Sequence, residues 1–130
     1  MISLLLVAAA ASADLDALDQ QVTRCDRAAA SPTFAADAAR RAQFLLDAYR
    51  EQEEIVSART DLSSRRRAWR ESDRPSASAD KQLKLEEAAL DDRQKMLNDQ
   101  RMLEGIRKDA MDSMRHYFLI NCPAGKDVGR

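Results

Sequence analysis

The chain has 130 residues, enough for one domain. Charged residues make up 33% of it and aromatic residues only 5%, with three Gly and three Pro, which favours long helices over a turn-rich globule. The formal net charge of -1 excludes a global attraction to nucleic acid or to a membrane, so an anionic partner would have to be recognised by a local cluster of charge.

The first thirteen residues have the pattern of a secretory signal peptide. An apolar run over 2–10 precedes Ala11-Ser12-Ala13, an A-x-A cleavage signal, and the first charge is Asp14. The run is too short to span a bilayer, which takes about 20 apolar residues. We therefore expect 1–13 to be removed on export to the periplasm. The alternative is an N-terminal helix whose apolar end packs on the core.

A short first helix is predicted over 14–30. Its small and apolar side chains recur at spacings of three and four residues, as on one face of a helix. They are Leu15, Leu18, Val22, Cys25 and Ala29. Ser31-Pro32 is predicted to end this helix, because the residue before a proline is driven out of helical geometry, and to start the next one.

The segment over 33–74 contains neither Gly nor Pro and is predicted as one helix, about 60 Å long if fully helical. Every seventh residue of its core-facing stripe is apolar, and this spacing predicts a left-handed supercoil with a partner helix. These positions are Ala48, Ile55, Leu62 and Trp69.

The clearest loop signal is 74–78, with one Pro and two Ser. A third helix of similar length is predicted over 79–121, with Ser76 or Ser78 as its cap and Cys122-Pro123 after its end. Its core stripe is predicted to be Ala89, Met96, Leu103, Ala110 and Tyr117. The polar residues 123–130 are expected to form a disordered tail.

Two helices of equal length on either side of a short loop are expected to be antiparallel. The predicted fold is therefore all-α: a long antiparallel two-helix hairpin, coiled-coil-like, over 14–122, with the short first helix folded onto its open end. A turn near Ser76 predicts four apolar meetings. They pair Phe34 with Phe118, Leu45 with Ile106, Ile55 with Leu97, and Leu62 with Leu90.

The two cysteines, Cys25 and Cys122, lie near the two ends of the exported chain. An even number of cysteines in such a chain favours a disulfide, here closing a loop of nearly 100 residues. The alternatives are two free thiols, a redox pair or a metal site completed by His116. No Cys-x-x-Cys motif supports redox work, and two Cys with one His fall short of four zinc ligands.

Basic residues gather around the predicted loop, where 65–84 carries seven cations against three carboxylates. Together with one tryptophan they form a candidate contact surface, the basic tip. Its residues are Arg65, Arg66, Arg67, Trp69, Arg70, Arg74, Lys81 and Lys84. Such a surface suits phosphate-bearing or other anionic groups of the envelope. The alternative is a solvated helix end with Trp69 packed near Leu83.

The chain has no Gly-rich loop, nucleophile elbow or paired-acid motif, so no catalytic residue, cofactor or metal ligand is predicted. His116, the only histidine, is interpreted as a surface residue. Gly105, on the polar side of its helix, either permits close approach of another chain or has no role. The methionines are interpreted as core residues, with an adaptable binding surface as the alternative.

Two partial resemblances bear on function. A pair of exported helices with a basic end is similar to the arms of the Skp type of periplasmic holdase, which also has a strand-rich body not seen in this pattern. The stretch over 65–70 resembles the Trp-containing segment of small helical lysozyme inhibitors, but the cysteine that follows it in that family is missing here.

The sequence thus favours a non-enzymatic periplasmic protein that works by contact with a protein or an anionic envelope surface. A holdase-like chaperone is the second interpretation, and a small enzyme or metal-binding protein is the third. No nucleic-acid partner is expected, and a homo-oligomer is compatible with the pattern.

Overall fold

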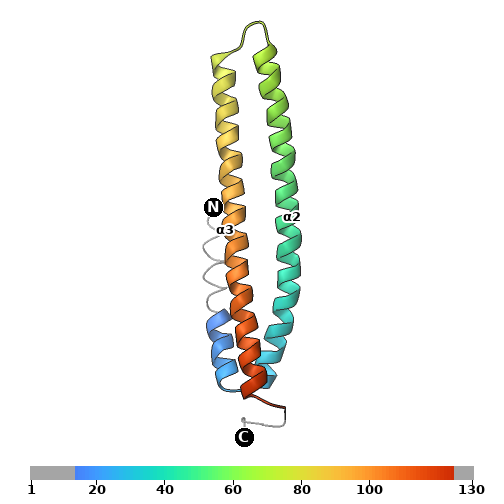
Figure 1. The fold of residues 1–130 in the computed structure, drawn as a ribbon, viewed down its shortest axis with the longest axis vertical. Coiled ribbons are helices and arrows are strands. Elements are labelled where there is room, and N and C mark those ends of the chain that lie inside the picture. Colours follow the sequence, from blue (N-terminus) through green and yellow to red (C-terminus); the bar gives the residue numbers. More distant parts are fainter. Residues whose placement is uncertain (1–13, 125–130) are drawn as a thin grey trace. The chain divides into compact units, whose positions relative to one another are not determined.

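The computed structural model describes residues 14–124, which are helical over 14–23, in α2 (Arg27–Glu71) and in α3 (Ala77–Asn121) (Figure 1). The all-α class is therefore confirmed for this part of the chain. The predicted signal peptide over 1–13 and residues 125–130 of the predicted tail lie outside it. Within 14–124, no helix combines the length and apolar character needed to cross a bilayer.

The first break in the helices is not at Ser31-Pro32, so that prediction was wrong. The chain turns over 24–26 instead, where Cys25 has a left-handed backbone with a φ of 53°. Asp26 caps α2, since its Oδ1 accepts a hydrogen bond from the Ala29 amide at 3.2 Å. Pro32 lies inside α2 and leaves one helical hydrogen bond unmade, but its would-be acceptor belongs to Ala28, which is exposed.

The second break, over 72–76, agrees closely with the predicted loop. The Oγ of Ser76 accepts a hydrogen bond from the Ala79 amide at 3.3 Å and so caps α3, as expected. Asp80 lies in the first turn of α3, where a negative charge is favoured. The helix ends at Asn121, directly before Cys122-Pro123.

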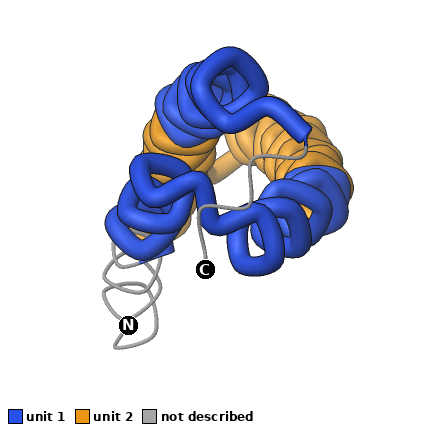
Figure 2. Tube along the Cα trace, turned by 90° about the horizontal axis from the view of Figure 1, so that it is seen from below, with its two compact units in different colours: residues 1–42, 105–130 blue, residues 43–104 orange. Residues whose placement is uncertain are grey.

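The chain divides into two compact units (Figure 2). Unit 1 contains the described residues 14–42 and 105–124, and unit 2 contains residues 43–104. Both α2 and α3 contribute a segment to each unit.

Unit 1 packs three helical segments around one apolar core. The first segment contributes Leu18 and Val22, which are 1% and 2% exposed. The rest of the core comes from the unit's parts of α2 and α3 and the residue after α3: Ala30, Phe34, Met111, Phe118 and Cys122. The rings of Phe34 and Phe118 lie 6.0 Å apart between centroids, which confirms that predicted meeting. Arginines stack on both rings: Arg27 over Phe118 at 4.9 Å and Arg115 over Phe34 at 5.3 Å.

Unit 2 is an antiparallel pair of helical segments, because its cross-helix contacts run in opposite directions along the chain. Glu51 pairs with Arg93 at 2.9 Å, and further along α2 Arg66 pairs with Asp80 at 3.6 Å. Leu62 and Leu90 belong to one buried cluster with Leu83, as expected for the first two. Next to the first of these ion pairs, the side-chain amides of Gln52 and Gln94 donate hydrogen bonds to each other at 2.9 and 3.0 Å.

The predicted core stripe of α3 was wrong by one residue along the sequence. Met96 and Leu103 are 48% and 60% exposed, and Tyr117 is 47% exposed. The buried residues of α3 are Leu83, Leu90, Leu97, Met111 and Phe118. This second series buries large side chains where the predicted one would have buried two alanines, so it removes more apolar surface from water. Leu45 and Ile106, which were predicted to be apolar core residues, are each 59% exposed.

Candidate functional site

The cations of the basic tip fall into two groups, and three of them are held in ion pairs. Arg65 pairs with Asp61 at 2.9 Å and also with Glu86. Arg66 pairs with Glu87 at 2.9 Å, and Lys84 with Asp80 at 2.9 Å. The hydrogen bond between Arg65 and Glu86 raises the pKa of Arg65 and lowers that of Glu86, as expected for a carboxylate beside a guanidinium.

The other four cations make no ion pair or hydrogen bond within residues 14–124. They are Arg67, Arg70, Arg74 and Lys81, and all are exposed. Glu71 and Asp73 are likewise unpaired in this range, so the free groups leave an excess of two positive charges around the loop. We refer to Arg67, Arg70, Arg74 and Lys81 as the free cations.

Beside the free cations, unit 2 has an open cavity of about 240 Å³. Arg67 and Arg70 line it, one helical turn apart on α2, together with Ser63 and the paired Arg66. Its remaining lining comes from Leu62 and Glu87. The lining is therefore mostly guanidinium and hydroxyl groups, and the Glu87 carboxylate is paired with Arg66, so the cavity suits a small anionic group better than an apolar ligand.

Trp69 is half-buried and packs against the Leu62 cluster. Its indole Nε1 donates a hydrogen bond to the Ser76 carbonyl at 2.8 Å. These contacts tie the end of α2 to the cap of α3, which corresponds to the packed alternative considered from the sequence.

A second surface, not anticipated from the sequence, consists of large apolar side chains of unit 2 that remain 44–63% exposed. On α2 they are Leu45, Leu46, Tyr49 and Val56, and on α3 they are Leu85, Met96, Met102 and Leu103. We call these eight residues the apolar stripes. The signal was present in the sequence as a regular seven-residue spacing of Ala89, Met96 and Leu103, but it was interpreted as core.

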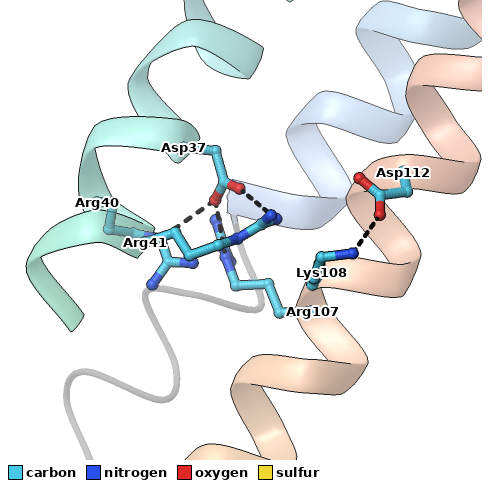
Figure 3. A network of polar contacts seen from close by, with 6 residues as sticks. All are labelled: Asp37, Arg40, Arg41, Arg107, Lys108 and Asp112. Atoms are coloured by element: carbon cyan, nitrogen blue, oxygen red, sulfur yellow. Dashed lines mark hydrogen bonds and ion pairs between the residues drawn. The ribbon is translucent and has the colours of Figure 1, made fainter. Parts of the chain in front are cut away.

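An ion cluster in unit 1 was also missed (Figure 3). The carboxylate of Asp37, whose side chain is 5% exposed, accepts hydrogen bonds from Arg40 at 3.1 Å and Arg107 at 3.2 Å. A third guanidinium, that of Arg41, lies 3.4 Å from its other oxygen. Three guanidinium groups occupy the oxygens of this carboxylate, and such charge-assisted contacts fix side chains in place, so the cluster suits a structural role.

Unit 1 also contains the cysteine pair. Cys25 and Cys122 form a disulfide with a Cα–Cα distance of 5.3 Å across 97 residues of sequence. Arg27 donates a hydrogen bond to the Cys122 carbonyl at 2.6 Å and so joins the start of α2 to the same point. Both half-cystines are therefore held by the packing of unit 1.

The remaining sequence candidates offer no chemical centre. His116 is exposed, and no group of three or more His, Cys, Asp or Glu within residues 14–124 is placed to hold a metal ion. A Cβ added at Gly105 would meet nothing within 4 Å, so no other described segment approaches this glycine closely.

No protein-family model matches this chain, and comparisons with curated proteins and with solved structures give no match either.

Proposed function

We propose that this chain is an exported, non-enzymatic protein that works by contact with other proteins through the apolar stripes of unit 2. The observation that carries the proposal is the exposure of these eight large side chains. Leu45, Tyr49 and Val56 recur along one side of α2, and Met96 and Leu103 along one side of α3, so each stripe has the geometry to receive a helix or an extended apolar segment.

The energetic scale fits a reversible contact. Burying the remaining exposed half of one such side chain contributes roughly 1 kcal/mol, or about 8 kcal/mol for all eight. Association costs an estimated 4–15 kcal/mol in lost freedom of motion. One stripe contributes about 4 kcal/mol, which at best cancels this cost, so a partner that covered only one stripe would not bind stably, whereas one that covered both would bind weakly and reversibly.

Export to the periplasm is the second part of the proposal. The apolar run over 2–10, the Ala11-Ser12-Ala13 signal and the Cys25–Cys122 disulfide support it, because disulfides persist in oxidising compartments. We expect the mature chain to start at Asp14, as a coiled-coil-like antiparallel hairpin with the first helix folded onto its open end. N-terminal sequencing of the native protein tests the cleavage, and recovery of intact Met1 in a soluble fraction would refute it.

Crosslinking in the native compartment tests the contact surface. A photoreactive residue at Leu103 or Met96 should form adducts with a protein partner, whereas one at Arg101, which is also exposed on α3, should form few. The variant Met96→Ser/Leu103→Ser should keep its melting temperature, because both side chains are exposed. If one partner covers both stripes, this variant should also lose the adducts that a photoreactive residue at Tyr49 forms. Equal labelling at all three α3 positions would contradict the proposal.

A holdase-like chaperone is the alternative, favoured by the exposure of Met96 and Met102. Methionine side chains adapt to many apolar shapes, which suits a surface that binds unfolded clients. Under this alternative the purified protein should suppress aggregation of a chemically unfolded client, and Met96→Ser/Met102→Ser should reduce that effect. A small enzyme or metal-binding protein remains the third candidate, and none of the observations above favours it specifically.

A further inference from the structure

The free cations have a distribution that a single small ligand does not explain. Arg67 and Arg70 lie on the last turns of α2, Arg74 lies in the loop, and Lys81 lies in the second turn of α3. Only the first two line the cavity of about 240 Å³. An array of anions on a surface, in contrast, offers partners to Arg74 and Lys81 as well.

The pairing pattern adds a second argument. Carboxylates neutralise Arg65, Arg66 and Lys84, but leave the four positions nearest the loop without a counter-ion in the described chain. The whole chain carries a net charge of -1, so an anionic surface would attract it only when the loop end of unit 2 approaches first. Arginine also matches phosphate in geometry, because its planar fork can donate two hydrogen bonds to one phosphate.

We infer that the loop end of unit 2 binds the phosphate headgroups of an anionic lipid surface, with Arg67, Arg70, Arg74 and Lys81 each contacting a headgroup. Arg67 and Arg70 hold one phosphate at the edge of the cavity, beside the Ser63 hydroxyl, while Arg74 and Lys81 contact its neighbours. This inference concerns a surface distinct from the apolar stripes and stands independently of the proposed protein partner.

The test uses the full chain and vesicles of phosphatidylcholine containing one fifth phosphatidic acid. Trp69, the only tryptophan, directly precedes Arg70 in the sequence and packs against the Leu62 cluster. Its fluorescence reports binding, with vesicle co-sedimentation as the second readout. Pure phosphatidylcholine vesicles measure any partition through the apolar residues 1–13. The expected result is binding to the acidic vesicles that exceeds binding to the neutral ones and falls steeply as salt is raised from 0.1 to 0.5 M.

Two double variants with the same net charge separate the surface from the overall charge. Arg67→Gln/Arg70→Gln removes two free cations and should weaken binding roughly 25-fold, at about fivefold for each cation near an anionic surface. Arg59→Gln/Arg93→Gln removes two paired cations of unit 2 that lie at least eight residues farther from the loop than Arg67. This variant should change binding less than about twofold, because the attraction of the surface falls off within a Debye length. Arg74→Gln/Lys81→Gln tests the other half of the array and should match the first variant.

Three results would overturn the inference. Equal loss in the free and paired variants would show a response to net charge alone. Equal binding to neutral and acidic vesicles would place the contact elsewhere in the chain. Complete competition by 10 mM inorganic phosphate at constant ionic strength would indicate a site for one free phosphate rather than a lipid surface. Circular dichroism of each variant establishes that it is folded before binding is measured.

Discussion

Reduction of the Cys25–Cys122 disulfide should destabilise the protein strongly. The bond joins the turn before α2 to the residue after α3, so the covalent loop that it closes contains both long helices. Without the bond, the contacts of folded unit 1 remain, but the unfolded chain gains conformational entropy because its loop is no longer closed.

The magnitude follows from the length of that loop. For the 97-residue separation, the chain-entropy model gives about 4–5 kcal/mol of stabilisation at 25 °C. For a chain of this size, 1 kcal/mol corresponds to roughly 4 °C in Tm, so reduction should lower Tm by roughly 15–20 °C. Replacement of Cys122 adds a packing loss, because this residue is only 3% exposed.

The assay is thermal unfolding followed by circular dichroism, with and without reductant. The wild-type protein should show the large shift, and Cys25→Ala/Cys122→Ala should show none, because reductant then has no bond to break. A wild-type Tm that stays within 2–3 °C after complete reduction, verified by thiol titration, would refute this account of its stability.

Three smaller perturbations test other parts of the structure by urea denaturation. Gly105→Ala should stabilise α3 by about 1 kcal/mol, since the added Cβ meets open space and alanine favours the helix; destabilisation would reveal a contact there. Asp37→Asn should cost about 3 kcal/mol, because it removes the charge of the buried carboxylate to which three partly exposed arginines are paired. Asp47→Asn at an exposed pair should cost less than about 0.5 kcal/mol. The hydrogen bond with Arg65 is the main cause that lowers the pKa of Glu86 from its ordinary value of 4.5. The pair therefore stabilises the fold at pH values above 4.5, and this contribution is lost as the pH falls through the lowered pKa. Glu86→Gln should accordingly lose less stability than wild type between pH 6 and pH 3.

Helix content and the loop before α3 could be predicted because their signals are local. A serine directly after a proline-containing loop, such as Ser76, is a common helix cap. The chain has only three Gly and three Pro, the residues that most often interrupt a helix. The first break could not be predicted in the same way. Ser31-Pro32 is the stronger local signal, but Asp26 also provides a cap, and packing of Ala30 and Phe34 in the core of unit 1 favours a helix that continues through the proline.

Which face of α3 is buried depends on its tertiary contacts with α2, and the periodicity of the sequence alone does not reveal them. One seven-residue series contains Met96 and Leu103, and another, one residue along, contains Leu90 and Leu97. Both predict an amphipathic helix, and only the partner segment of α2 decides between them. The same limit applied to the basic tip: the sequence located the cations, but the pairing of Arg65 with Glu86 and of Arg66 with Glu87 joins α2 to α3 and required the fold.

The reciprocal amide pair of Gln52 and Gln94 makes the alignment of unit 2 insensitive to solution conditions. Beside it, Arg93 forms ion pairs with Glu51 and Glu54, and salt screens such pairs. An amide neither titrates nor carries a charge. A shift of one helix by a turn would separate both partners and leave their half-buried groups unsatisfied. The two helical segments should therefore keep their register in high salt, where the ion pairs of unit 2 are screened and no longer distinguish one alignment from another.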